Sequence, residues 1–336
     1  MNPTPPHSTR QVLLAARPEG ALTLDAFRTV EVDLPAPGPG QVVVRNSHLS
    51  LGAVMREQME ADANLPDALP IFRVGEPLEA FAVGTVVAGA ADDLPVGTTV
   101  VYGSPWAEYA VTSAAVPLPA DSLPEPQYAF ATGNVATALL GVRDGARVGD
   151  GDVVLVTGAA GGVGSMAGQI ARKLGAARVV GTAGSAAKCS WLVDELGFDA
   201  AVGHRSDSFL DELRAAAPEG FSVVVDLVGG AQFETAVELA APHARIAVLG
   251  ALAAQSGGGW PRFDTQTAIM KGLHVSGFAL AHAPHLMAEA PALFGRWLGE
   301  GMVYPNTVVD GGLDAAPQAL IDLLAGAYTG SVSVRL

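Results

Sequence analysis

The chain has 336 residues, 49% of them hydrophobic, with a formal net charge of −15 and a single cysteine. A charge this negative argues against nucleic acid as a partner, because a phosphate backbone attracts dense Lys/Arg surfaces. One cysteine excludes an internal disulfide and fits a reducing compartment. No apolar run approaches the roughly 20 residues of a membrane span, and no signal-like segment begins the chain. We therefore expect a cytoplasmic two-domain protein that binds neither nucleic acid nor membrane.

The first third of the chain consists of short β-like runs. They cover residues 11–16, 27–33, 40–51, 80–89 and 98–103. Turn sequences rich in Pro and Gly, such as PAPGPG and DDLPVG, separate these runs. Closely spaced strands of this kind predict a β-barrel or a strongly bent sheet rather than βαβ units.

The middle of the chain alternates apolar strands with helices. After a helical stretch expected at 128–142, runs such as DVVLV, ARVVG and FSVVVD are each followed by a helix-like segment. This alternation is typical of a doubly wound α/β domain around a buried parallel sheet. The C-terminal segment is strand-like again and is expected to return to the first domain. The sequence predicts a β-rich domain of residues 1–122 and 300–336 and a Rossmann domain of residues 123–299.

A glycine-rich turn, TGAAGGVG, lies between the first of these strands and its helix. Gly158, Gly161 and Gly164 form the pattern G-x-x-G-x-x-G. The first glycine permits a tight turn, the second lets the backbone approach a pyrophosphate, and the third lets helix and strand pack closely. In a chain rich in Ala and Gly the pattern could be a tight turn alone. The strand before it and the helix after it favour dinucleotide binding.

Two basic residues indicate which dinucleotide binds. The second strand ends in VVGTAGSAAK without the Asp or Glu that would bind a ribose 2′-hydroxyl. Lys188, one of only three lysines, follows this strand, and Arg205 follows the third strand. Basic residues at these places accept a 2′-phosphate, so NADP(H) is predicted over NAD(H). The alternative is that both are solvated surface residues.

The chain resembles the zinc-free medium-chain dehydrogenase/reductase superfamily over nearly its whole length. Within it the resemblance is to the leukotriene 12-hydroxydehydrogenase, prostaglandin reductase and alkenal double-bond reductase group. The segments that carry it include WAEYAV at 106–111, AAGGVGSMAGQIARKLGA at 159–176, VDLVGG at 225–230 and GAYTGSVSV at 326–334. The resemblance implies a GroES-like β domain, a Rossmann domain, NADPH in the cleft and a homodimer, which would form through the sheet edge near 273–280.

Carried over residue by residue, the resemblance implies a set of cofactor contacts along the Rossmann domain and one on the C-terminal segment. These are Gly161, Gly162, Val163, Gly164, Ser165, Gly184, Ser185, Lys188, His204, Arg205, Leu249, Gly250, Ala251, Phe278, Ala279, Leu280 and Tyr328. No metal is predicted, because a single cysteine cannot form a sulfur-rich zinc site and the histidines are scattered.

The family reaction is hydride delivery from NADPH to the β-carbon of an α,β-unsaturated ketone or aldehyde, followed by protonation of the enolate. Hydrogen-bond donors at the developing oxyanion lower such a barrier. The chain has Val54 and Gln255 where many members have tyrosines. The remaining candidates for catalytic donors are Tyr328, Gln255 and Arg56. Alternatively, Tyr328 packs on a terminal strand and Arg56 forms a structural ion pair.

These departures leave more than one function open. The leading prediction is an NADPH-dependent enzyme that reduces the activated C=C bond of a small apolar carbonyl compound. A quinone or specialised-metabolite reductase, or a redox-neutral cyclase or isomerase on the same fold, is the first alternative. A non-catalytic NADPH-binding protein is the second.

Overall fold

The chain separates into two units at Phe130/Ala131 and again at Pro305/Asn306. One unit comprises Met1–Phe130 and Asn306–Leu336, and the other comprises Ala131–Pro305. The structure, a computed structural model, describes residues 6–63, 65–66, 69–89, 91, 93–118, 123–255 and 259–336. Among these residues no helix combines the length and the apolar character that crossing a bilayer requires.

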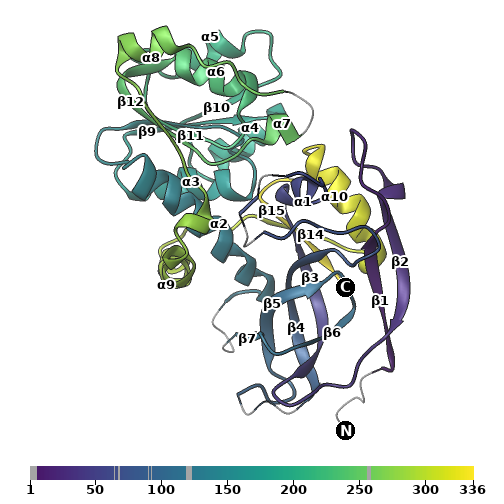
Figure 1. The fold of residues 1–336 in the computed structure, drawn as a ribbon. Coiled ribbons are helices and arrows are strands. Elements are labelled where there is room, and N and C mark those ends of the chain that lie inside the picture. Colours follow the sequence, from purple (N-terminus) through teal and green to yellow (C-terminus); the bar gives the residue numbers. More distant parts are fainter. Residues whose placement is uncertain are drawn as a thin grey trace. The chain divides into compact units, whose positions relative to one another are not determined.

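A six-stranded parallel sheet forms the centre of the second unit (Figure 1). Its strands are β8 (Val153–Val156), β9 (Arg178–Ala183), β10 (Ala200–Gly203), β11 (Phe221–Asp226), β12 (Ala240–Val248) and β13 (His274–Gly277). They lie in the order β10-β9-β8-β11-β12-β13, which is 3-2-1-4-5-6 in chain order. This is the doubly wound order whose direction reverses between the first and fourth strands. The predicted Rossmann fold is therefore confirmed.

Helices cover the two faces of this sheet, with α2 and α3 below it and α5, α6 and α8 above it in Figure 1. The helices and turns are α2 (Ala131–Leu139), η3 (Leu140–Gly145), α3 (Gly162–Lys173), α4 (Ala186–Asp194), α5 (Phe209–Ala216), α6 (Gly230–Glu238), α7 (Leu252–Gln255), α8 (Thr265–Lys271), η4 (Leu280–His282) and α9 (His285–Gly299). Because both faces are covered, strand side chains such as Leu155, Val180 and Val224 are fully buried. This burial explains why the strands read as continuous apolar runs rather than as alternating patterns.

The helix expected at 128–142 is divided into three pieces. A 3-10 turn, η2 (Pro126–Phe130), precedes α2, and the π-helical turn η3 follows it. In η3 the Ala146 N–H donates to the Gly141 carbonyl at 2.8 Å, a spacing of five residues. Such π turns often mark functional sites, and this one packs beside the ends of β12 and β13.

The first unit is mainly antiparallel β structure. Its strands are β1 (Ser8–Leu14), β2 (Phe27–Asp33), β3 (Val42–Leu51), β4 (Glu79–Gly89), β5 (Thr99–Pro105), β6 (Tyr109–Thr112), β7 (Val116–Pro117), β14 (Asn306–Val309) and β15 (Ser331–Arg335). The short helices are η1 (Leu24–Ala26), α1 (Val54–Gln58), η5 (Leu313–Ala315) and α10 (Ala316–Leu324). β1 and β2 form a ribbon, and a larger sheet runs in the order β14-β15-β3-β4-β5-β7 with β6 also on β3.

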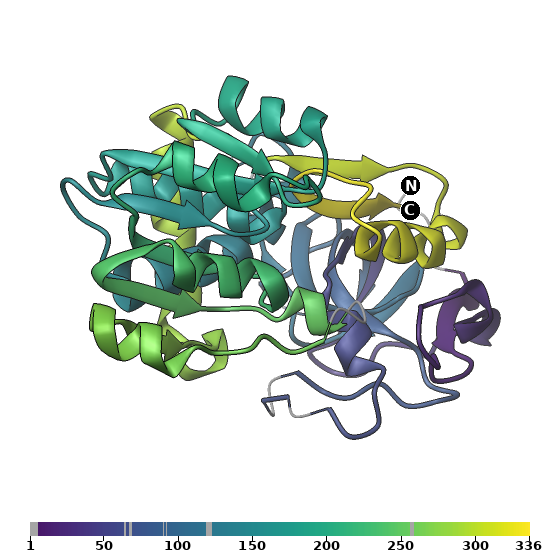
Figure 2. The same cartoon turned by 90° about the horizontal axis from the view of Figure 1, so that it is seen from above.

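The C-terminal strand joins the N-terminal strands, as the sequence predicts. β15 pairs antiparallel with β3, where Val332 lies opposite Leu51. In Figure 2 the yellow C-terminal segment lies beside the blue N-terminal strands of this unit. The core beneath these strands contains Leu14, Leu49 and Trp106, whose side chains are all fully buried. Apolar side chains from both ends of the chain therefore bury each other in one unit.

Candidate functional site

The glycine-rich turn after β8 is tightly packed. Gly158 has φ +61°, in the left-handed region that favours glycine, and a Cβ there would lie 2.9 Å from Val228 Cγ2. A Cβ on Gly164 would lie 2.5 Å from the Gly158 carbonyl oxygen and 2.8 Å from Ala159 Cα. The first turn of α3 can approach the β8 turn this closely only because Gly164 has no side chain.

The N-terminus of α3 directly follows this glycine-rich turn. Within the described residues no side chain caps this helix, and no acidic residue lies in its first turn. Gly161 precedes the helix, and the buried Ser165 hydroxyl turns inward to the Gly162 carbonyl at 3.2 Å. N–H groups at a helix start carry partial positive charge and bind phosphate. The turn and helix start therefore suit a pyrophosphate, to which Val163 would add a further backbone N–H.

Basic groups converge at the ends of β9 and β10. A Cβ on Gly184 would lie 3.4 Å from His204 Nε2 and 4.0 Å from Arg205 Nη2. Ser185 caps α4 by accepting from the Lys188 N–H at 3.3 Å, which places Lys188 in the first turn. Burial and then the Arg205 charge lower the pKa of Lys188, and the same two causes lower the pKa of His204.

This convergence follows from the parallel sheet. Gly203 pairs with Ala183, and the His204 N–H donates to the Ala183 carbonyl at 3.0 Å. The residues after β10 therefore lie beside the turn after β9. Like charges brought together resist protonation, and an anion between them relieves that repulsion. In a chain of net charge −15, a cluster of this sign suits a phosphate group.

Two of the predicted cofactor contacts, Leu249 and Phe278, lie against the π turn η3. Leu249 packs on Gly141, where a Cβ would meet its Cδ1 at 2.3 Å. Phe278 packs on Gly145, where a Cβ would meet its ring at 2.7 Å. Both side chains are therefore held by glycines of one turn, although 29 residues of sequence separate them.

The backbone after Leu249 runs close to the turn after β11. A Cβ on Gly250 would lie 2.5 Å from the Leu227 carbonyl oxygen, so this position requires glycine. Ala251 Cα lies 3.8 Å from the Cβ position of Gly229. Two further predicted contacts, Ala279 and Leu280, lie at the start of η4.

A buried hydrogen-bond network that the sequence analysis missed joins these turns. The Asp226 carboxylate, with 0% exposure, accepts from the Thr157 hydroxyl at 2.6 Å and from the Gly229 N–H at 3.0 Å. Burial raises the pKa of Asp226. Beside it the Thr182 hydroxyl accepts from the Gly158 N–H at 3.0 Å and donates to Gln232 at 2.6 Å. The sequence signal that could have revealed this network is Asp226, an acidic residue at the end of an apolar strand in the segment VDLVGG.

Replacing Thr157 by Val is expected to destabilise the protein. The variant keeps the side-chain shape but leaves a buried carboxylate without its hydroxyl donor, which costs about 1–3 kcal/mol. Urea unfolding should show a lower midpoint for Thr157→Val, whereas Thr157→Ser, which keeps the hydroxyl, should lose less than half as much. Equal stability of wild type and Thr157→Val would contradict this account of the network.

The three predicted catalytic residues lie in different surroundings. The Arg56 guanidinium is buried in the first unit, where it pairs with Glu60 and donates to the Gly20 carbonyl at 2.9 Å. This geometry favours the structural ion pair over a catalytic role. Tyr328, also in the first unit, packs on its core and donates to Asp322 at 3.3 Å. Burial and the Asp322 charge raise the pKa of Tyr328.

Gln255 is the last residue of α7 in the second unit. Its backbone N–H donates to the Ala251 carbonyl at 3.1 Å, and its side chain is half-buried. The amide can donate a hydrogen bond, although it cannot release a proton at neutral pH. Gln255 therefore remains a candidate for binding a carbonyl oxygen rather than for protonating a carbon.

Within the described ranges no group of three or more His, Cys, Asp or Glu side chains is placed to hold a metal ion. The single cysteine, Cys189, is half-buried in α4, and burial raises the pKa of its thiol.

Known proteins resemble this chain over almost its full length. Two family models match it, an N-terminal domain of oxidoreductase over residues 10–118 and a zinc-binding dehydrogenase over residues 162–295. The NADPH-dependent curcumin reductase of Escherichia coli (strain K12) is 32% identical, over 97% of this chain and 96% of the relative. Prostaglandin reductase 1 of Bos taurus is 31% identical, over 94% and 95% respectively.

A solved structure agrees with these relatives. The crystal structure of CurA in complex with NADPH from Vibrio vulnificus superposes with a TM-score of 0.89 at 30% identity, covering 97% of this chain and 98% of that one. The resemblance inferred from sequence motifs is thereby confirmed by whole-chain similarity in sequence and fold. The chain belongs to the zinc-free medium-chain dehydrogenase/reductase superfamily, in its group of prostaglandin and alkenal reductases.

Proposed function

We propose that the protein is an NADP(H)-dependent reductase of a C=C bond conjugated to a ketone or aldehyde. The observation that carries the proposal is the cluster of Lys188, His204 and Arg205 around Gly184 in a chain of this family. A basic cluster at the ends of the second and third strands is the arrangement that accepts a 2′-phosphate. Two relatives that bear the names of NADPH-dependent and prostaglandin reductases support the same chemistry.

The residues of the second unit fit the parts of this cofactor. The turn at Gly158–Gly164 and the start of α3 would hold the pyrophosphate through backbone N–H groups. The basic cluster would hold the 2′-phosphate, and Leu249 and Phe278 would offer apolar surface to the nicotinamide half. When bound, NADPH supplies a hydride to the β-carbon of the conjugated substrate.

The protein must also stabilise negative charge on the substrate oxygen. Preorganised donors at such an oxygen are worth several kcal/mol in enzymes. Arg56 is already engaged by Glu60 and the Gly20 carbonyl. We therefore propose Gln255 of the second unit for this role, with Tyr328 of the first unit, whose hydroxyl donates to Asp322, as the alternative. A phenol with a raised pKa remains protonated at neutral pH and can donate a hydrogen bond.

An anaerobic assay tests this function. The protein is mixed with NADPH and a panel of apolar enones, enals and quinones, and both NADPH absorbance and product are followed. Consumption of NADPH with formation of the saturated carbonyl compound is the expected result. Turnover of quinones alone, product change without NADPH loss, or tight NADPH binding without any product would each replace the proposal with one of its alternatives.

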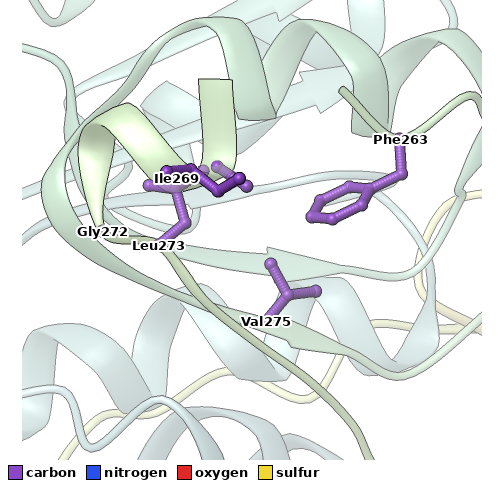
Figure 3. A pocket seen from close by; sticks show the side chains of 6 residues that line it. Phe263, Ile269, Gly272, Leu273 and Val275 are labelled. Atoms are coloured by element: carbon purple, nitrogen blue, oxygen red, sulfur yellow. The ribbon is translucent and has the colours of Figure 1, made fainter. Parts of the chain in front are cut away.

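We further propose that the protein forms a homodimer through the edge of its parallel sheet. Among the described residues β13 pairs only with β12, so one side of this strand offers unpaired backbone groups. Apolar side chains beside it are exposed, Ile269 by 76% and Met270 by 79%. Phe263, Ile269, Leu273 and Val275 line an open hollow of about 430 Å³, and Figure 3 shows their side chains around it. Exposed apolar patches of this kind mark association surfaces.

A charge placed in this patch is expected to separate the subunits. Ile269→Asp would bury a carboxylate in the interface, which should weaken the dimer at least about tenfold. Light scattering after size-exclusion chromatography should report a dimer for wild type and a monomer for the variant at equal concentration. Leu24→Asp, at an exposed apolar residue of the other unit, should remain dimeric. A monomeric wild type would overturn this assignment.

A further inference from the structure

His204 has an unusual position for a titratable group. Its Nε2 lies 3.4 Å from the point where Gly184 would carry a Cβ, so the ring nitrogen faces the turn after β9. The His204 backbone is fixed there by its hydrogen bond to the Ala183 carbonyl at 3.0 Å. The imidazole is half-buried and shares this space with Arg205. A ring nitrogen held in a basic cluster can contact any anion bound there.

The charges that face His204 are mainly positive. Arg205 lies in the same turn as His204, and Lys188 lies on α4. The Arg205 charge lowers the pKa of both His204 and Lys188. On α5, the Glu212 carboxylate accepts from the hydroxyls of Ser206 and Ser208, and its charge helps to raise the pKa of Cys189. Among the described residues, burial and Arg205 lower the pKa of His204, and no carboxylate raises it. Burial and the Arg205 charge therefore disfavour the protonated ring until an anion binds beside it.

We propose that His204 is a protonatable contact of the cofactor 2′-phosphate, which makes the preference for NADP(H) over NAD(H) increase as the pH falls. This inference rests on the proposed cofactor and adds a specificity-determining residue to it. Lys188 and Arg205 are the other two basic side chains of the cluster. His204 supplies a third positive charge only when protonated. NAD(H) has a hydroxyl in place of the 2′-phosphate, so it carries no charge at this position that would favour the protonated imidazole.

The direction of the pH effect follows from linkage. Without cofactor, burial and Arg205 hold the pKa of His204 below its ordinary value. A phosphate dianion favours the charged imidazole, so the pKa of His204 is higher in the complex than in the free protein. Binding then takes up a proton. The added affinity is complete below the free-protein pKa and is lost as the pH rises through the pKa in the complex.

Equilibrium binding of NADP⁺ and NAD⁺ tests the inference without relying on turnover. Calorimetric titrations are carried out at constant ionic strength between about pH 6.5 and about pH 8.5. Over this range the NADP⁺ affinity of wild type should fall about five- to tenfold more than that of His204→Gln, because a pKa difference of one unit corresponds to a tenfold change in affinity. Because the phosphate also titrates near pH 6, the comparison with His204→Gln removes that shared contribution. NAD⁺ affinity should show no such difference.

Two further variants make the outcome decisive. His204→Arg carries a permanent charge and should bind NADP⁺ tightly with the same pH profile as His204→Gln, which reflects the titration of the phosphate alone. His7→Gln, at an exposed residue of the first unit, should retain the wild-type slope. If wild type prefers NADP⁺ but has the same pH slope as His204→Gln, the role of His204 is overturned and the cofactor assignment stands. If wild type binds NADP⁺ no better than NAD⁺ at any pH, the proposed function fails as well.

Discussion

Gly164→Ala is expected to raise the Kd for NADPH by about 100-fold or more, which corresponds to about 2.7 kcal/mol. The new methyl group would lie 2.5 Å from the Gly158 carbonyl oxygen and 2.8 Å from Ala159 Cα. Both obstructing atoms belong to the backbone, so no side chain can rotate away. The start of α3 must move from the β8 turn, and the N–H groups that would meet the pyrophosphate move with it. Titration of NADPH fluorescence measures the loss.

The matched control is Gly295→Ala. Gly295 lies within α9, and a Cβ there meets no atom within 4 Å. This variant should bind NADPH like wild type and unfold at a slightly higher urea concentration, because Gly in a helix costs about 0.5–1 kcal/mol relative to Ala. NADPH binding by Gly164→Ala within threefold of the control would show that close packing of α3 does not position the phosphate site.

Lys188→Ala is expected to weaken NADPH by about 10- to 100-fold and NADH by less than about threefold, since hydrogen bonds to charged groups contribute about 1.5–3 kcal/mol. Lys188 lies in the first turn of α4, beside Arg205. Its charge meets the 2′-phosphate, which NADH lacks. Parallel calorimetric titrations with the two cofactors at low and at high salt measure the difference, which should shrink as salt rises.

Lys173→Ala provides the control for charge alone. Lys173 lies on α3 and pairs with Glu300 at 2.8 Å. Its removal changes the net charge by the same amount but should leave the ratio of the two affinities within about twofold of wild type. Equal losses of NADPH and NADH affinity in Lys188→Ala would reject the 2′-phosphate assignment.

Local sequence patterns determined the elements and the class of the fold. The run FRTVEVD was predicted as a strand and forms β2 over the same residues, Phe27–Asp33. The alternation of apolar runs with helices predicted a doubly wound sheet, and the order β10-β9-β8-β11-β12-β13 confirms it. The glycine-rich turn could also be predicted from sequence, because the φ of +61° at Gly158 is a conformation that favours glycine whatever the rest of the fold. Such features depend on neighbours in sequence, so one sequence suffices to find them.

The sequence also identified the superfamily, whereas the cofactor contacts carried over from it stay predictions. The catalytic positions were harder to predict. Arg56 reads equally as an oxyanion partner or as half of an ion pair, and its contacts with Glu60 and the Gly20 carbonyl favour the pair. The roles of Tyr328 and Gln255 stay predictions. A residue type states which hydrogen bonds are possible, whereas its surroundings decide which of them are made.

Contacts between distant segments were decided only by the tertiary structure. Asp226 and Thr157 are 69 residues apart, yet their hydrogen bond joins the turns after β8 and β11. His204 faces Gly184 only because β10 lies beside β9. Parallel strands bring their carboxyl ends to one edge of the sheet, whatever the length of chain between them. The sequence therefore determined the fold and the class of cofactor, and the pairing of strands decided which side chains share the proposed phosphate site.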